Sequence, residues 1–142
     1  MTSSLHPDVT HDMLQQALTD WFAPWVQALN LEVVSFGDGE ATLRLPHSPQ
    51  LSRVGGMVCG QAMMSAADTA MVLAIVTRLG NQRPMTTVQL NTSFLKPLSG
   101  QDALVTARVI RAGRSLAFGE IDIRGEADGQ SVCRASTTYA LL

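Results

Sequence analysis

The stretch GQAMMSAADTAMVLAIVTRL, residues 60–79, decides the fold. Between Gln61 and Thr77 its only charged residue is Asp68, and a helix that is apolar on all sides is a buried helix. Small residues recur at every fourth position, which lets a sheet approach closely; they are Ala62, Ala66, Ala70 and Ala74. The stretch therefore predicts a buried central helix that ends near Gly80.

Alternating apolar and polar residues on both sides of this helix predict strands. Before it come a leading helical region over residues 12–29, broken by Pro24, then two strands joined at residues 37–39 and a loop over residues 46–56. After it come four strand signals, over residues 87–95, 103–111, 116–124 and 132–142. In the first of these, Val88, Leu90 and Phe94 are expected on one face.

An antiparallel sheet with one apolar face needs an apolar cover. Only the long helix has enough apolar surface to provide it. The fold class predicted is therefore α+β, with an antiparallel sheet wrapped around one long central helix.

Composition narrows the function classes. The 142 residues suit one domain, with residues 1–10 expected to form a mobile tail. The formal net charge of −2 and the lack of a basic run give no reason to expect nucleic acid. Only 15% of residues are charged, which indicates that a second subunit covers part of the surface. Residues 62–76 are too short for a membrane span. The two cysteines fit a cytoplasmic protein with free thiols.

The apolar helix is an unfavourable position for the carboxylate of Asp68, so stability alone does not explain this residue. Burying a carboxylate costs several kcal/mol unless it is paired or hydrogen-bonded, and no lysine or arginine lies one helical turn away. One interpretation is a structural aspartate that faces a hydrated boundary between packed elements, or that is hydrogen-bonded by a hydroxyl such as that of Ser65. The other is a general base or nucleophile, and so apolar a setting favours it.

The loop before the helix, Gly55-Gly56-Met57-Val58-Cys59-Gly60, brings small residues to a helix N-terminus. Free N–H groups and the positive end of the helix dipole can hold a developing oxyanion there. Glycines that merely permit a turn explain the same pattern equally simply, so the loop has meaning only together with Asp68.

Several stretches together resemble one known family. They are residues 56–60 (GMVCG), 66–70 (AADTA), 88–97 (VQLNTSFLKP), Gly100 and 109–115 (VIRAGRS). They are similar to the PaaI-like branch of the hotdog-fold thioesterase superfamily. The resemblance runs from about Pro24 to Leu142. It implies active sites between subunits whose sheets join edge to edge, as a homodimer or a dimer of dimers.

The family pattern begins the helix with His-Gly-Gly and has an acidic residue nine positions after the histidine. In this chain Cys59 stands in place of the histidine, and Gly60 and Gln61 in place of the glycines. Asp68 keeps the acidic position. Cys59 supplies no imidazole, and Gln61 adds a side chain near the oxyanion position.

Two further positions follow from the same resemblance. The family's loop asparagine, six residues before the histidine, is Arg53 here, and the hydroxyl that helps to place water in some members matches Thr87. Arg53 offers no amide, and we expect it to pair with Asp68.

The resemblance implies hydrolysis of an acyl-CoA thioester. We expect the Gly60 N–H to polarise the carbonyl, with Gln61 as an added donor. Asp68 from the facing subunit then activates water or attacks directly, and Thr87 orients the water. No cofactor or metal is expected, since no His/Cys/Asp cluster suggests one.

Arginines are the candidates for binding the CoA phosphates. They are Arg53 and, in the turn of the Gly-Arg-Ser motif, Arg111 and Arg114; the other expected substrate-binding residues are Cys59, Gly113 and Ser115. Arg111 and Arg114 can equally be read as ordinary solvated turn residues.

Alternatives remain at this stage. The replaced histidine and asparagine suit a non-catalytic acyl-CoA-binding module, and a hotdog 3-hydroxyacyl dehydratase would use His47 with Asp68. Cys59 at a helix N-terminus can be read as a nucleophile, although a small packed residue is the simpler reading. Trp21 and Trp25 are packing residues or the lining of an acyl tunnel.

Overall fold

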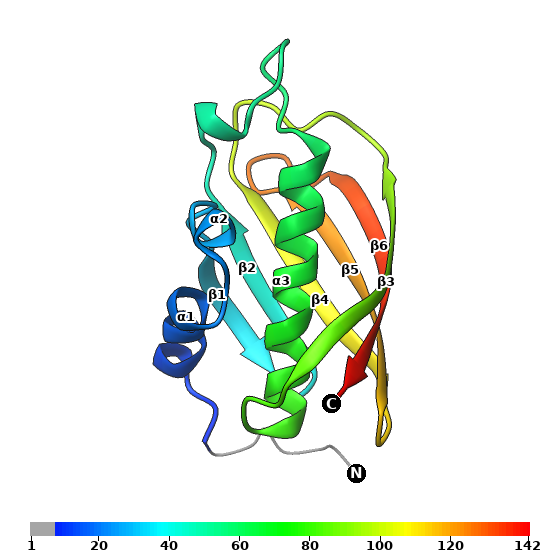
Figure 1. Ribbon diagram of the computed structural model, residues 1–142. Helices are drawn as coiled ribbons and strands as arrows, with labels where there is room; N and C mark the ends of the chain where they lie inside the picture. Colours follow the sequence, from blue (N-terminus) through cyan, green and yellow to red (C-terminus); the bar gives the residue numbers. More distant parts are fainter. Residues whose placement is uncertain (1–7) are drawn as a thin grey trace.

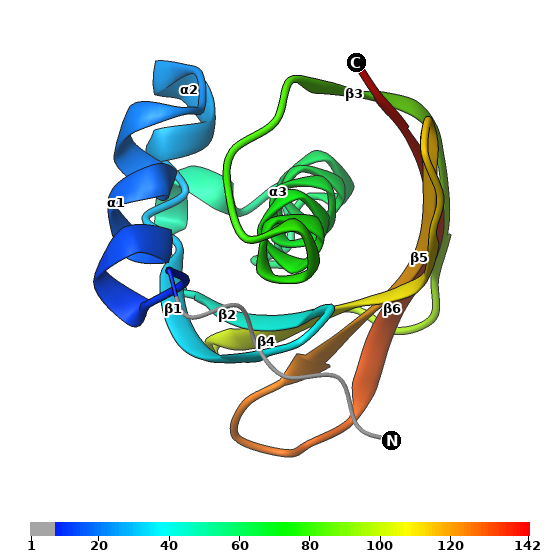
Figure 2. The same cartoon turned by 90° about the horizontal axis from the view of Figure 1, so that it is seen from below.

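The computed structural model describes residues 8–142, which form a curved antiparallel sheet of six strands around one long helix (Figures 1 and 2). The helices are α1 (His11–Asp20), α2 (Pro24–Gln27), α3 (Gly60–Leu79) and a short 3-10 turn, η1 (Pro49–Leu51). The strands are β1 (Glu32–Gly37), β2 (Glu40–Leu45), β3 (Met85–Phe94), β4 (Ala103–Ala112), β5 (Leu116–Gly125) and β6 (Ser131–Leu141). Their order in the sheet is β1-β2-β4-β5-β6-β3. The predicted architecture is confirmed.

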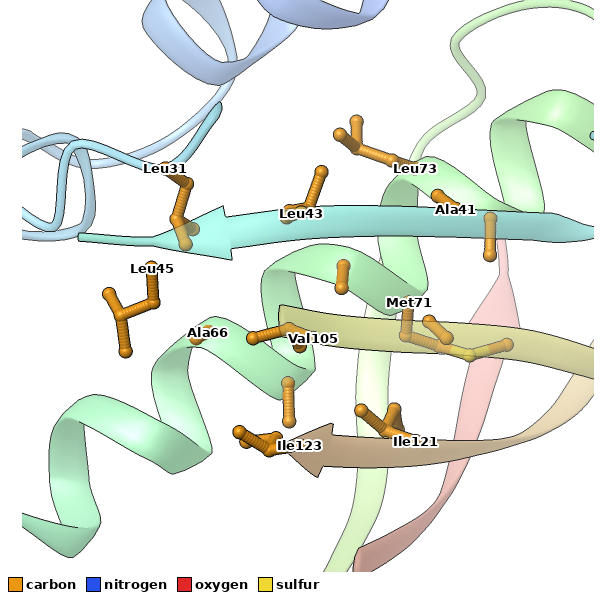
Figure 3. Packing of buried hydrophobic residues seen from close by; sticks show 14 of the residues in the cluster. Leu31, Ala41, Leu43, Leu45, Ala66, Met71, Leu73, Val105, Ile121 and Ile123 are labelled. Atoms are coloured by element: carbon orange, nitrogen blue, oxygen red, sulfur yellow. The ribbon is translucent and has the colours of Figure 1, made fainter. Parts of the chain in front are cut away.

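α3 forms the centre of the core and packs chiefly against β2, β4 and β5. The four alanines spaced along it are all buried, and Figure 3 shows Ala66 and Met71 among the side chains of the sheet. At Gly119 of β5 a Cβ atom would lie 2.1 Å from Cε of Met71 and 2.9 Å from the backbone oxygen of Arg108, so a larger residue here would have to displace the methionine side chain and the neighbouring strand. The helix ends, as predicted, at a left-handed Gly80 with φ of 84°.

α3 has the length and mean hydropathy that a membrane span requires. The helix has 20 residues, whereas the apolar run identified in the sequence covers only residues 62–76. The expectation that it is too short is therefore wrong. Within the fold, 67% of its most apolar window is buried. Core packing explains the apolar character.

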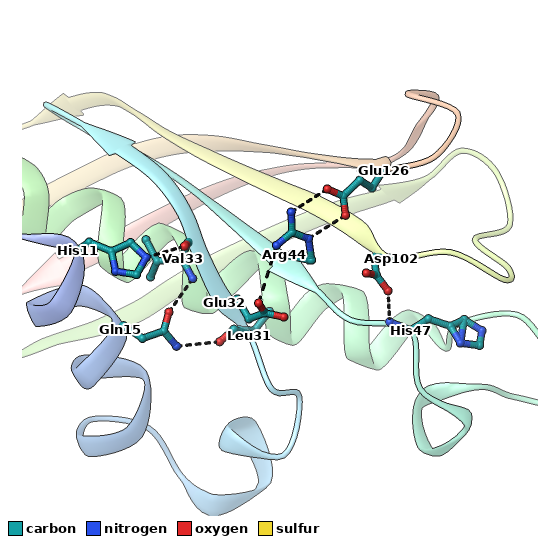
Figure 4. A network of polar contacts seen from close by, with 9 residues as sticks. All are labelled: His11, Gln15, Leu31, Glu32, Val33, Arg44, His47, Asp102 and Glu126. Carbon is teal, nitrogen blue, oxygen red and sulfur yellow. Dashed lines mark hydrogen bonds and ion pairs between the residues drawn. The ribbon is translucent and has the colours of Figure 1, made fainter.

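The predicted break in the leading helical region is confirmed, because α1 ends at Asp20 and Pro24 begins α2. The extent of the N-terminal tail differs from the prediction. Residues 9 and 10, expected in a mobile tail, belong to the fold: Val9 is buried and Thr10 caps α1; residues 1–7 lie outside the described part. The side chain of Gln15 binds the edge strand β1 by accepting from Val33 N at 2.8 Å and donating to Leu31 O at 3.3 Å (Figure 4).

The other edge strand, β3, has no strand on its outer side within residues 8–142. Its register against β6 shifts between Thr87 and Gln89, so Val88 is the extra residue of a β-bulge. Val88 is 61% exposed, which corrects its expected place on one face with Leu90 and Phe94. The strand also starts two residues earlier than predicted, at Met85.

Candidate active site

Two hydroxyl groups donate hydrogen bonds to the half-buried carboxylate of Asp68 in the middle of α3. Thr87 Oγ1 of β3 lies 2.9 Å from Oδ1 and 3.2 Å from Oδ2. The phenol of Tyr139 in β6 donates to the same Oδ1 and lies 3.0 Å from the backbone oxygen of Asp68. Because both hydroxyls converge on Oδ1, Oδ2 keeps lone pairs for another molecule. Ser65, the hydroxyl suggested from sequence, takes no part; its backbone oxygen accepts from Thr69.

Tyr139 is the chain's only tyrosine and is 2% exposed. Burial, and then the negative charge of Asp68, raises the pKa of its phenol above the ordinary range, so the hydroxyl stays protonated and donates. The role of Tyr139 was not predicted from the sequence. The available signal was a lone buried phenol, whose hydroxyl needs a partner.

The bulge at Val88 brings Thr87 to Asp68. Thr87 pairs directly with Tyr139, and directly opposed residues share a face of the sheet. In a regular strand, Thr87 would lie on the opposite face from Leu90, because side chains alternate. The extra residue reverses that alternation, so that Thr87 and Leu90 both face inward.

The start of α3 carries free backbone amide groups. Cys59 is the N-cap, and its side chain makes no capping hydrogen bond. The Gly60 N–H cannot be bonded within the helix, and no group among residues 8–142 accepts from it. A Cβ at this position would lie 3.1 Å from Cζ of Phe94, so the aromatic ring packs against the helix start. An open pocket of about 490 Å³ adjoins it, lined among others by Gln61 and Arg53.

Asp68 and Gly60 do not meet within one chain. They are eight residues apart on one helix, which places them about 12 Å apart along its axis and about 80° apart around it. A single carbonyl group cannot contact both. One chain therefore contains the two halves of the expected site, the carboxylate and the amide, at different places.

Two residues near the pocket lie away from Asp68. Arg53 is exposed, and its guanidinium contacts the sulfur of Met57 at 3.5 Å. The expected ion pair between Arg53 and Asp68 is not formed among residues 8–142. His47 is exposed on the loop after β2, where its backbone N–H donates to Asp102 Oδ1 at 2.7 Å (Figure 4). The partners of Asp68 lie on β3 and β6, so one chain does not bring His47 and Asp68 together.

The turn between β4 and β5 contains the other expected substrate-binding residues. Gly113 N donates to Leu116 O at 2.8 Å to close the turn, and Arg111, Arg114 and Ser115 are exposed. The turn lies at the end of the molecule opposite the start of α3 (Figure 1). Their role in binding phosphate stays a prediction.

Comparison with known proteins identifies the family. A family model described as the thioesterase superfamily matches residues 55–132. A putative esterase of Saccharolobus solfataricus is 27% identical over 114 residues, covering 80% of this chain and 80% of the relative. Acyl-coenzyme A thioesterase 13 of Homo sapiens is 23% identical over 137 residues, covering 90% and 96%.

A solved structure shares the fold. The PaaI protein from the phenylacetic acid degradation operon of Escherichia coli has a TM-score of 0.79 at 18% identity, covering 93% of this chain and 94% of that one. The family match spans more than half of the chain and includes the start of α3, Asp68 and Thr87. This chain is a hotdog-fold protein and belongs to the thioesterase superfamily.

Proposed function

We propose that the protein is an acyl-CoA thioesterase whose active site forms between two copies of the chain. The observation that carries the proposal is the state of Asp68: two hydroxyls hold Oδ1 while Oδ2 remains available, in the wall of an otherwise apolar helix. The buried phenol of Tyr139 and the exposed hydroxyl of Thr87 hold the carboxylate in one orientation.

Water activation follows from the direction of the hydrogen bonds. Thr87 uses its single proton on Asp68, so its oxygen can still accept. One water molecule can donate to Thr87 Oγ1 and to Asp68 Oδ2 at once. Asp68 then removes a proton as the water attacks the thioester carbonyl. Direct attack by Asp68 remains the second route: it expels the CoA thiolate and forms an acyl-Asp68 anhydride, which water then hydrolyses. A single turnover in heavy-oxygen water that leaves label in the Asp68 carboxylate indicates this route, because attack by water on the thioester leaves the oxygens of Asp68 unlabelled.

The amide at Gly60 supplies the other half of the chemistry. Its free N–H and the positive end of the helix dipole stabilise the oxyanion that develops on the carbonyl. Gln61, exposed beside the pocket, adds a side-chain donor. A CoA thiolate leaves readily, so this scheme requires no strong general acid.

The free edge of β3 gives the route by which the halves meet. A two-fold axis near the middle of β3 pairs two copies antiparallel, so that the Phe94 end of one strand lies beside the Thr87 end of the other. Because Phe94 packs on Gly60, this pairing moves the amide of one chain towards the Asp68 of its partner. It also gives the unpaired strand a partner and covers exposed apolar side chains, Val88, Phe94 and Leu95.

The test is Asp68→Asn, assayed by thiol release from acyl-CoA. The amide keeps an oxygen that accepts from Thr87 and Tyr139, so the fold is retained, whereas kcat falls by about 10²–10⁴ because the base is lost. Asp122→Asn is the matched control, since Asp122 is also half-buried and accepts from a hydroxyl, Ser131 Oγ, at 2.7 Å.

Four outcomes test the proposal and its alternatives. Turnover that Asp68→Asn abolishes and Asp122→Asn retains supports the thioesterase. Binding of acyl-CoA without turnover indicates a binding module. Hydration of an enoyl-CoA indicates the dehydratase. Hydrolysis that survives Asp68→Asn within about tenfold removes Asp68 from the chemistry.

A further inference from the structure

A second cavity lies on the same side of α3 as Asp68, towards the C-terminal end of the helix. It has a volume of about 200 Å³. Its apolar walls come from the end of α1, from α3 and from the start of β3, in the residues Trp21, Phe22, Val72, Val76 and Met85. Figure 2 shows the segment that links α3 to β3 on the side of α3 where α1 and α2 lie.

The cavity begins one helical turn from the Asp68 carboxylate. Val72 and Val76 follow Asp68 at four-residue intervals, so the three share one face of α3, with neighbouring Cβ atoms about 5–6 Å apart. On β3, Met85 and Thr87 both face inward, since each is paired with an inward residue of β6. The helix and the strand that hold the carboxylate thus continue directly as two walls of the cavity.

Arg83 also lines the cavity, and it donates to the backbone oxygen of Arg114 at 3.0 Å and to that of Leu142 at 3.3 Å. These bonds attach the segment between α3 and β3, which forms part of the cavity wall, to the β4–β5 turn and to the residue that follows β6.

We propose that this cavity binds the acyl group of the substrate and favours a medium-chain over a short-chain acyl-CoA. The inference rests on the proposed function, because it takes the thioester carbonyl to lie beside Asp68. Val72 and Val76 extend the apolar wall by about 6 and about 12 Å along the helix axis from Asp68. Each methylene group that enters the cavity leaves water and contributes about 0.8 kcal/mol to binding. An octanoyl chain therefore gains more from this wall than a butanoyl chain.

The first test fills the cavity with Val72→Phe. Val72 is half-buried and outside the fully buried core, so a larger side chain is accommodated by occupying the cavity. We expect kcat/KM for octanoyl-CoA to fall at least about tenfold while butanoyl-CoA changes less than about twofold. Val26→Phe is the control, because Val26 is also half-buried but lines a different pocket, between α1, α2 and β1.

A second variant and a binding measurement complete the test. Phe22→Ala enlarges the same cavity and shifts the preferred chain length upward. Calorimetry with thioether analogues, which cannot be hydrolysed, measures the affinity of the cavity for the alkyl chain independently of catalysis. S-octyl-CoA binds to the wild type at least about tenfold more tightly than S-butyl-CoA, and Val72→Phe removes this difference.

The outcomes distinguish this inference from the hydrolase proposal. Length-dependent binding that Val72→Phe abolishes supports the acyl cavity even if no acyl-CoA is hydrolysed, in which case the hydrolase proposal alone fails. Hydrolysis without length dependence, or a chain-length profile that Val72→Phe and Val26→Phe alter equally, overturns the acyl cavity and leaves the hydrolase proposal standing.

Discussion

Asp68 is tolerated in an apolar helix because its charge is met by two hydroxyl donors on neighbouring strands. Hydrogen bonds to a charged group are worth about 1.5–3 kcal/mol each, which offsets much of the cost of partial burial. Both donors bind mainly one oxygen. The same contacts that make Asp68 compatible with the fold therefore leave its other oxygen for chemistry.

Tyr139→Phe tests whether the phenol positions Asp68. Tyr139 is buried and reaches the carboxylate from within the protein, so the change leaves KM within about twofold, while kcat falls about 10–100-fold through loss of one charge-assisted bond. Steady-state kinetics separates the two constants. The control is Thr137→Val, which removes a buried hydroxyl of the same strand, bonded to Gln89 O at 2.8 Å. Equal losses of kcat in both variants would indicate a purely structural role.

Cys59→Ser tests the reading of Cys59 as a packed residue. The cysteine caps α3 without a side-chain bond, and serine is a preferred N-cap, so the free energy of unfolding rises by about 0.5–1 kcal/mol and activity is retained. Denaturant unfolding and thiol release measure the two effects. Cys133→Ser, in the core, instead lowers stability by leaving a buried hydroxyl without a partner. Loss of activity in a stable Cys59→Ser protein would make Cys59 a nucleophile.

At the scale of elements, α3 was predictable because each signal is local. Its apolar run, its isolated aspartate, its glycine at the end and its bounds can all be read within residues 60–80. The inward faces of β4, β5 and β6 were predictable for the same reason, since simple alternation holds along most of each strand.

The parts that were missed depend on contacts between distant segments. A bulge adds one residue to β3 without any mark in the sequence, so alternation alone put Val88, in place of Thr87, on the inner face. The bond from Tyr139 to Asp68 joins residues 71 positions apart. The resemblance to the family supplied Thr87 but did not supply Tyr139.

Val88→Asp tests β3 as the joining edge. A charge on the exposed bulge residue opposes pairing of two β3 edges, so the variant is monomeric, folded and inactive. The control is Val34→Asp, because Val34 is also an exposed bulge valine, on the opposite edge strand β1. Analytical ultracentrifugation gives the oligomeric state. If Val88→Asp remains a dimer with full activity, the chains join elsewhere.

At the scale of the whole molecule, one chain separates the carboxylate from the amide by about 12 Å along α3. In the proposed antiparallel pairing of two β3 strands, the Gly60 amide of each chain lies near the Asp68 carboxylate of the other. Each dimer would therefore contain two composite sites. The pocket at the start of α3 and the cavity beyond Asp68 then belong to different chains around one thioester.

Mixing two inactive variants tests this central claim most directly. Asp68→Asn removes the base, and Gly60→Pro removes the amide donor at a helix position where proline is tolerated. Cys59, with ψ of 149°, already has the extended backbone that a following proline requires. Gly60→Ala is the control, since it adds a Cβ beside Phe94 but keeps the N–H.

The two variants are denatured together, refolded and assayed for thiol release beside each variant alone. If each site takes Asp68 from one chain and Gly60 from the other, random pairing gives one intact site in half of the dimers, and activity returns to about a quarter of the wild-type value. If the mixed dimers form and activity stays at the sum of the separate variants, the two groups do not act together across the pair.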